Sequence, residues 1–216
     1  KLLRGGRLAD PVSLERFRRE ALAMTRLEHP HVVRVLDFGV AEPAGAFIVM
    51  ELLEGRSLRE EITERERFRP DEATPLMRQI CAAVAAVHEA GLIHRDLKPA
   101  NVFVERTPEG PRARLLDFGI AKLADAVGSL TSLTATGVFL GTPAYTPPEA
   151  WQGEPLDARS DVYSLGCLFY EMLAGRPPFV SGRIARLMML HAVEEPEPPS
   201  AHAPGVAPAV EVALLR

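Results

Sequence analysis

An acid, a cation and an amide lie within six consecutive positions of this 216-residue chain, at Asp96, Lys98 and Asn101. Pro99 fixes the backbone between the cation and the amide, which favours an ordered loop. A carboxylate accepts a proton, an ammonium neutralises phosphate charge, and an amide oxygen binds a hard cation. Phosphoryl transfer requires these three groups, because its catalysis depends mostly on positioning and charge stabilisation. The alternative is a polar loop between a helix and a strand.

The whole string, His94-Arg95-Asp96-Leu97-Lys98-Pro99-Ala100-Asn101, resembles the catalytic loop of protein kinases, in which Asn follows the Asp of His-Arg-Asp by five residues. Over essentially its full length the chain is similar to bacterial eukaryotic-like Ser/Thr protein kinases. The resemblance implies an α+β, bilobal fold. A partial β-rich N-lobe with the hinge would span residues 1–54, and a largely helical, C-terminally truncated C-lobe would span residues 55–216.

The same resemblance implies ATP-dependent phosphorylation of Ser or Thr hydroxyls on proteins. Asp96 would orient the hydroxyl and accept its proton, and Lys98 would offset charge on the transferred group. The hydroxyl of Thr142 would bond both side chains. Asn101 and Asp117 would hold Mg²⁺, with Mn²⁺ as an alternative ion.

Asp117 belongs to an Asp-Phe-Gly string that also occurs at residues 37–39. This duplication shows that the string alone is a weak signal. The metal ligand must follow the catalytic loop across one hairpin, and only Asp117 does so. Asp37 is expected at the end of a strand that enters a turn.

Glu20 falls inside the apolar stripe of a predicted helix, where a carboxylate is costly unless it is paired. That stripe consists of Leu14, Phe17, Ala21 and Met24. The resemblance pairs Glu20 with Lys1, nineteen positions earlier (20 − 1), which would touch the α- and β-phosphates. The alternative is a glutamate at the edge of the stripe whose carboxylate reaches water.

Residues 51–55, Glu-Leu-Leu-Glu-Gly, resemble the hinge that joins the two kinase lobes. Backbone N–H and C=O groups of Glu51 and Leu53 would hold the adenine there, and Met50 would border the back of the pocket.

Residues 128–141 are rich in Ser and Thr and, apart from Val138-Phe139-Leu140, contain few large apolar residues. Thr134 and Thr136 precede Thr142 by eight and six positions, where the resembling kinases carry activating threonines. Phosphorylation at either would create an anion suited to the guanidinium of Arg95. The alternative is a loop that is Ser/Thr-rich without a regulatory role.

Two further acids have predicted structural roles. Glu149 closes a Pro-Pro-Glu string that stands where the family has Ala-Pro-Glu. The usual partner of that glutamate is an arginine near the end of the domain, for which the sequence offers no candidate. Asp161 begins an apolar helix and is expected to accept N–H bonds from the catalytic loop. The alternative is an acid favoured only by the helix dipole.

Hydrophobic periodicity and turn residues predict the remaining elements. The predicted strands are 32–36, 46–50 and two around residues 108–111; the predicted helices are a short one at 58–62, one from 71 to Gly91, 159–174, 184–193 and a final one cut at Arg216.

The charge balance, 25 − 29 = −4, argues against a dedicated nucleic-acid binder. Cys81 and Cys167 are expected to be buried free thiols in a reduced cytosol. No apolar run reaches membrane-spanning length and no signal peptide is recognisable, so we expect a cytoplasmic domain, which in full length the family often anchors to a membrane.

The absence of an initial Met and of a glycine-rich loop before Lys1 leads us to expect a fragment with weak or no activity of its own. Expected partners are protein substrates and another copy of the chain for autophosphorylation. Two other function classes stay open: a pseudokinase acting as a binding module, and a small-molecule phosphotransferase of related fold. Intact Asp96, Asn101 and Asp117 argue against the first, and Arg95 with Lys98 against the second.

Overall fold

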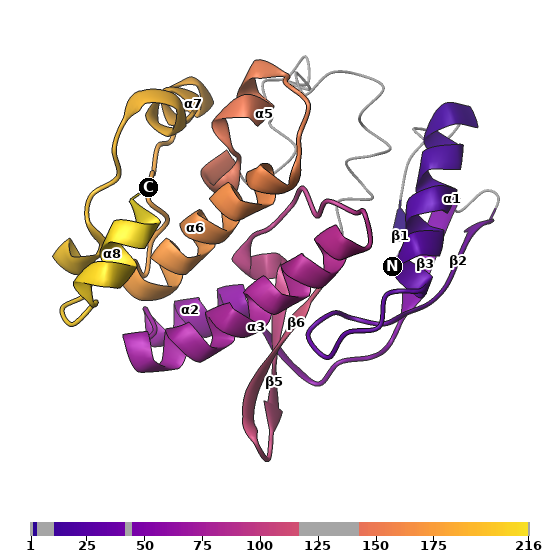
Figure 1. Cartoon of the computed structure of the whole chain (residues 1–216), viewed down its shortest axis with the longest axis horizontal. Helices are drawn as coiled ribbons and strands as arrows, with labels where there is room; N and C mark the ends of the chain where they lie inside the picture. The colour runs from indigo at the N-terminus through magenta and orange to yellow at the C-terminus, as the bar shows by residue number, and fades with distance from the viewer. Residues whose placement is uncertain (1, 4–10, 42–44, 117–142, 216) are drawn as a thin grey trace.

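The computed structural model describes residues 2–3, 11–41, 45–116 and 143–215 (Figure 1). One antiparallel sheet has the strand order β1-β3-β2, from β1 (Leu2–Leu3), β3 (Gly45–Met50) and β2 (Val35–Ala41). Helix α1 (Pro11–Thr25) packs against β2. A second antiparallel sheet has the order β4-β5-β6, from β4 (Gly55–Ser57), β5 (Val102–Thr107) and β6 (Gly110–Leu115).

Helix α1 buries the stripe that the sequence predicts. Phe17, Ala21 and Met24 are buried in the core, and Leu14 packs against it half-buried. The ring of Phe17 meets that of Phe38 on β2 edge-on, with centroids 6.1 Å apart. This packing fixes which side of α1 turns away from the sheet.

The second strand is longer and lies later than the sequence predicts. Instead of residues 32–36, β2 spans Val35–Ala41, and Asp37 lies inside it opposite Val49. The prediction that Asp37 ends the strand is therefore wrong. Residues 37–41 pair with 45–49 after a bulge between Val35 and Asp37, so ladder hydrogen bonds extend the strand beyond the turn residue Gly39.

Helices form most of the remaining structure and lie beside the second sheet (Figure 1). Ser57 and Glu60 form a reciprocal capping box at the start of α2. The helical segments are α2 (Leu58–Arg65), α3 (Pro70–Glu89), η2 (Pro99–Asn101), η3 (Pro143–Tyr145), α5 (Pro148–Gln152), α6 (Ala158–Ala174), α7 (Ile184–Val193), η4 (Pro199–Ala201) and α8 (Pro208–Leu214).

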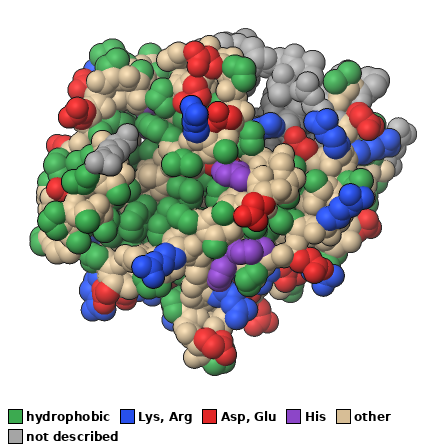
Figure 2. Space-filling view, in the orientation of Figure 1, with side chains coloured by type: hydrophobic (Ala, Val, Ile, Leu, Met, Phe, Trp, Pro, Cys, Tyr) green, Lys and Arg blue, Asp and Glu red, His purple; other side chains and the backbone are tan. Residues whose placement is uncertain are grey.

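Helix α6 is the centre of this helical region and packs against α3 and α8. Leu168, Met172 and Leu173 on α6 are fully buried. Gly175 ends the helix at φ 75°, and a Cβ there would lie 2.3 Å from the carbonyl oxygen of Glu66, so only glycine fits. Hydrophobic side chains also gather on the surface over α6 and α8 (Figure 2).

The two cysteines differ in environment. Cys167 is buried, and burial raises the pKa of its thiol to about 12, which keeps it protonated. Cys81 is exposed on α3, so the prediction of two buried thiols is wrong for this residue. A helical pattern places a residue on one face of a helix but does not show which neighbour covers that face. Among the described residues, no helix is both long and apolar enough to cross a membrane.

A buried histidine should make the free energy of unfolding depend on pH. His191 on α7 lies 2.6 Å from the hydroxyl of Tyr163 through Nδ1, and burial lowers its pKa from 6.5 to about 4. As the pH is lowered from 6.5 to 4, the unfolded chain takes up a proton at His191 while the folded chain does not. The free energy of unfolding therefore decreases as the pH is lowered through that window. Thermal unfolding between pH 7 and pH 4.5 measures this slope. His191→Phe should flatten it, and equal slopes in parent and variant would contradict the assignment.

Candidate active site

The predicted catalytic loop, residues 94–101, lies between α3 and β5, and the structure brings its acid, cation and amide together. Lys98 donates from Nζ to Oδ2 of Asp96 over 2.7 Å, and Asn101 donates from Nδ2 to the same oxygen over 2.8 Å. The side chains of Asp96 and Lys98 are each 19 % exposed. The carboxylate is therefore held in place by two donors at the edge of the interior.

The amide of Asn101 has a defined orientation. Its Nδ2 also donates to the backbone oxygen of Asp96 over 2.8 Å, so both partners of this nitrogen are acceptors. The NH₂ group must face them, which directs Oδ1 the other way. Asn101 is buried, and its own backbone accepts a bond from the N–H of Leu116 over 2.8 Å. The loop is thereby joined to the residue that precedes the predicted metal ligand Asp117.

The side chain of His94 connects the loop to the residue that follows β6, a role that the sequence does not reveal. Its fully buried ring donates from Nε2 to the carbonyl oxygen of Leu116 over 2.8 Å, which leaves Nδ1 as the acceptor. The backbone N–H of Asp96 lies 3.3 Å from that Nδ1. A neutral imidazole thus joins the backbone of the acid to the end of β6.

Asp161 anchors the loop to α6 and is almost completely buried. Its Oδ2 accepts the backbone N–H of His94 over 2.8 Å, and its Oδ1 accepts that of Arg95 over 2.9 Å. These bonds favour the loop anchor over the plain helix-dipole acid. His88 on α3 adds a third bond, from Nε2 to Oδ2 over 2.7 Å. The sequence carries no local signal for the role of His88, because its partner lies 73 positions away.

Arg95 has a positive φ of 63°, which is uncommon for a residue with a side chain. The bond to Asp161 holds its backbone, and its side chain reaches α1. Nη1 of Arg95 lies 3.7 Å from Oε1 of Glu20, with the two side chains 29 % and 16 % exposed. Glu20 is therefore paired with a cation from the loop as well as being the predicted partner of Lys1. A purely solvent-facing Glu20 does not fit this contact.

The hinge residues follow β3 directly. Met50 packs half-buried against the core. The N–H of Glu51 donates to the carbonyl oxygen of Arg34 over 3.1 Å, so this donor is already used and only the C=O of Glu51 remains for a ligand. Within the described residues, no loop or turn backbone bond involves Leu53.

The segment after residue 142 is tied to α6 by buried polar contacts. Tyr145 on η3 donates its hydroxyl proton to Oε2 of Glu171, and Arg59 of α2 donates to Oε1 of Glu171 over 2.6 Å. Burial, and then the Glu171 carboxylate, raise the pKa of Tyr145 far above its ordinary value, so it stays protonated. Glu149 accepts a bond from Ser160 on α6 over 2.6 Å. No sequence pattern predicted these partners of Tyr145 and Glu149.

Five predicted site residues lie outside the described residues: Lys1, Asp117, Thr134, Thr136 and Thr142. The described ranges contain no cluster of three His, Cys, Asp or Glu side chains that could hold a metal. The roles predicted for these five residues therefore stay predictions.

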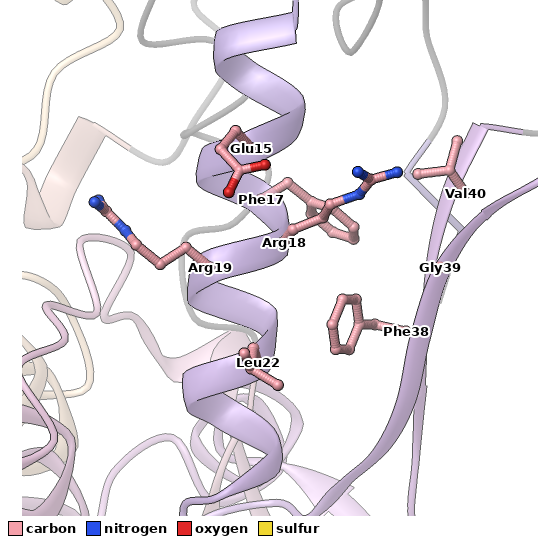
Figure 3. A pocket seen from close by; sticks show the side chains of 8 residues that line it. All are labelled: Glu15, Phe17, Arg18, Arg19, Leu22, Phe38, Gly39 and Val40. Carbon is pink, nitrogen blue, oxygen red and sulfur yellow. The ribbon is translucent and has the colours of Figure 1, made fainter.

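A hollow of about 370 Å³ lies between α1 and β2 (Figure 3). Arg18 extends across it toward Val40, while Leu22 and Phe38 line its lower part. None of its lining residues is a predicted site residue, so this hollow is distinct from the candidate active site.

Comparison with known proteins decides the family. Residues 7–201 match the model of the protein kinase domain. The chain belongs to the protein kinase family. It is 40 % identical over 219 aligned residues to the serine/threonine-protein kinase Pkn3 of Myxococcus xanthus and 42 % identical over 203 to a probable serine/threonine-protein kinase PknB of Corynebacterium glutamicum.

These alignments cover 100 % and 93 % of the chain but only 40 % and 31 % of the two relatives, so the chain spans well under half of their length. The crystal structure of the PknI kinase domain from Mycobacterium tuberculosis superposes with a TM-score of 0.74 at 26 % identity, covering 100 % of this chain and 75 % of that one. The predicted kinase-like fold and the resemblance to bacterial Ser/Thr kinases are confirmed.

Proposed function

We propose that the protein transfers the γ-phosphoryl group of ATP to Ser or Thr hydroxyls of proteins. The observation that carries the proposal is the cluster of Asp96, Lys98 and Asn101 within hydrogen-bond distance of one another. Asp96 would accept the proton of the attacking hydroxyl, and the ammonium of Lys98 would offset charge on the transferred group. Protein substrates follow from the family, as does the need for ATP and a divalent metal.

The donor set supports Mg²⁺, with Mn²⁺ as an alternative, because amide and carboxylate oxygens suit hard cations. Asn101 would supply its Oδ1, the atom that its two hydrogen bonds direct away from Asp96, and Asp117 would supply a carboxylate. A divalent ion held there would neutralise negative charge on the phosphates. Lys1, held by Glu20, would contact the α- and β-phosphates, and Thr142 would bond Asp96 and Lys98.

The test is incubation of the full-length protein with γ-labelled ATP, a divalent metal and a generic protein substrate, followed by identification of the labelled amino acid. Label on Ser or Thr supports the proposal. Binding of ATP without transfer would instead indicate a pseudokinase-type binding module. Transfer to small alcohols without protein label would indicate a small-molecule phosphotransferase.

We further propose an N-lobe with hinge over residues 1–54 and a C-lobe over residues 55–216. The first sheet ends at Met50 and the second begins at Gly55, on either side of the proposed hinge. A second copy of the chain is a proposed substrate for autophosphorylation. A cytoplasmic location is proposed because ATP is the donor, and the free thiols Cys81 and Cys167 suit a reducing compartment.

Activation by phosphorylation at Thr134 or Thr136 is a separate proposal. A phosphothreonine brings about −1.5 to −2 charges, and it would attract the guanidinium of Arg95, which already pairs with Glu20. The Thr134→Ala/Thr136→Ala double variant should lose roughly ten-fold or more in rate, the equivalent of one charge-assisted hydrogen bond. Mass spectrometry after incubation with ATP, followed by steady-state rates, measures this.

The matched control is Ser129→Ala/Ser132→Ala in the same segment, which should keep the parent rate. If neither threonine is modified and the threonine variant keeps full activity, the proposal is wrong.

A further inference from the structure

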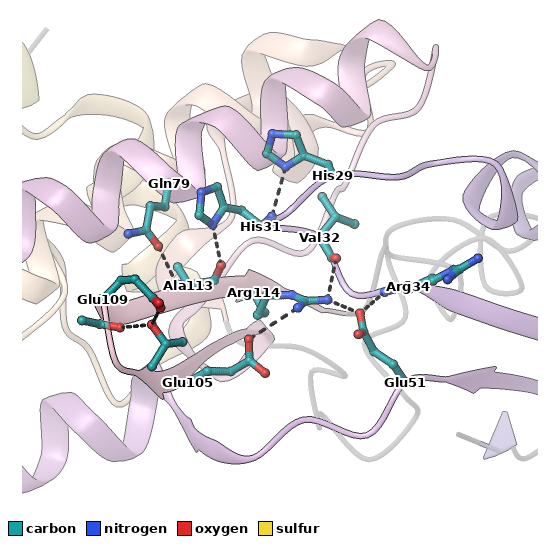
Figure 4. Close-up of polar contacts among 12 residues, drawn as sticks. His29, His31, Val32, Arg34, Glu51, Gln79, Glu105, Glu109, Ala113 and Arg114 are labelled. Atoms are coloured by element: carbon teal, nitrogen blue, oxygen red, sulfur yellow. Dashed lines mark hydrogen bonds and ion pairs between the residues drawn. The ribbon is translucent and has the colours of Figure 1, made fainter.

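Arg114, near the end of β6, joins three segments behind the hinge (Figure 4). Its Nη2 donates to Oε1 of Glu51 and, over 3.1 Å, to the carbonyl oxygen of Val32. Its Nη1 donates to Oε2 of Glu105 on β5 over 3.4 Å. One guanidinium therefore contacts Glu51, the first residue of the proposed hinge, as well as the segment before β2 and strand β5 of the second sheet.

This contact is largely removed from water. The side chains of Arg114, Glu105 and Glu51 are 12 %, 18 % and 31 % exposed. Two carboxylates and a carbonyl face a single cation there. Without the cation, each carboxylate would lose its charged partner in a largely buried place, which is costly enough to push the more exposed one, Glu51, toward solvent.

The position of the Glu51 side chain is coupled to its backbone. Oε1 of Glu51 also accepts the backbone N–H of Arg34 over 2.6 Å, while the N–H of Glu51 donates to the carbonyl oxygen of Arg34 over 3.1 Å. Moving the carboxylate therefore breaks one of the two bonds that hold Glu51 to Arg34. The C=O of Glu51, which the resemblance to the kinase hinge assigns to adenine, would turn with it.

From this geometry we propose that Arg114 is a positioning residue for the nucleotide: by binding the carboxylate of Glu51 it fixes the hinge backbone that receives adenine. The inference rests on the proposed function, because it needs ATP to bind at the hinge. It assigns to Arg114 a role in affinity for ATP, not in the transfer step at Asp96.

The experiment compares steady-state kinetics of the full-length parent with Arg114→Met, varying ATP at saturating protein substrate. We expect KM for ATP to rise about ten-fold or more, the loss of a hydrogen bond to a charged group, while kcat changes less than two-fold. A purely structural role would lower the fraction of folded enzyme, so kcat would fall and KM would stay constant. Arg114→Lys keeps the charge without the two-armed guanidinium and should recover part of the affinity.

Arg112→Met is the matched control, because Arg112 lies two residues earlier on β6 and no described contact joins it to the hinge. It should keep the parent KM. Glu51→Met leaves Arg114 without its acceptor at the hinge. It should raise KM as Arg114→Met does, and the double variant should add little, because both changes remove the same contact.

An unchanged KM in Arg114→Met overturns the inference, whether kcat falls or rises. Additive effects in the double variant overturn it as well. A parent enzyme that transfers no phosphate would overturn the proposed function first, so the two failures are distinguishable.

Discussion

Asp96→Asn is expected to lower kcat by about 10²–10⁴-fold, the usual contribution of a general base, while affinity for ATP stays within a few-fold of the parent. Asparagine has nearly the same shape, and its oxygen can still accept the bonds from Lys98 and Asn101 that the carboxylate receives. It cannot accept the proton of the attacking hydroxyl. The loop should therefore keep its conformation and lose its chemistry. Steady-state rates and calorimetric titration with ATP measure the two quantities.

Asp37→Asn is the control for this prediction. Asp37 lies in the other Asp-Phe-Gly string, and its exposed carboxylate accepts the neighbouring N–H of Phe38 over 2.8 Å on β2. We expect parent kinetics in this variant. If Asp96→Asn retained turnover within a few-fold of the parent, Asp96 would not be the base.

Asp161→Ala should affect both stability and turnover. The substitution leaves the buried N–H groups of His94 and Arg95 without their acceptor, so we expect the free energy of unfolding to fall by about 3–5 kcal/mol. Arg95 loses the bond that holds it at φ 63°, and the backbone next to Asp96 should relax. We expect kcat of the folded enzyme to fall at least about 100-fold, as for misplaced catalytic groups. Denaturant unfolding, and rates measured well below the unfolding temperature, separate the two effects.

Asp157→Ala provides the comparison at the same helix end. Asp157 caps α6 by accepting the N–H of Arg159 over 2.7 Å, but it is exposed and does not contact the catalytic loop. Loss of such a cap costs about 1 kcal/mol, and turnover should not change. Equal stability losses in the two variants would mean that Asp161 is only a helix cap.

Local sequence patterns predicted the parts of the site whose partners are close in the chain. Asp96, Lys98 and Asn101 lie within one loop, so their spacing in the sequence relates them without reference to any distant residue. The stripe of α1 and the apolar character of α6 were predictable for the same reason, since the apolar residues of a helix mark the face that it is expected to bury.

Contacts between distant segments were not predictable in this way. His88 joins Asp161 across 73 positions, and Arg59 joins Glu171 across 112. Neither residue carries a local signal, because a histidine or an arginine on a helix is ordinarily a solvated side chain. The length of β2 was misjudged because ladder pairing with β3 overrides the turn preference of Gly39.

Strand β6 bonds to residues 31–33, the segment before β2, through backbone groups as well as through the side chain of Arg114. Leu115 donates to the carbonyl oxygen of His31 over 2.8 Å and accepts from the N–H of Val33 over 3.0 Å. The covalent crossing at residues 51–54 is therefore accompanied by a second, non-covalent attachment. Two separated attachment points define a line, and a rigid body fixed along a line keeps one rotational degree of freedom. We expect the two proposed lobes to open and close about that axis, with twisting and sliding suppressed, so nucleotide would enter and leave from the side opposite the axis.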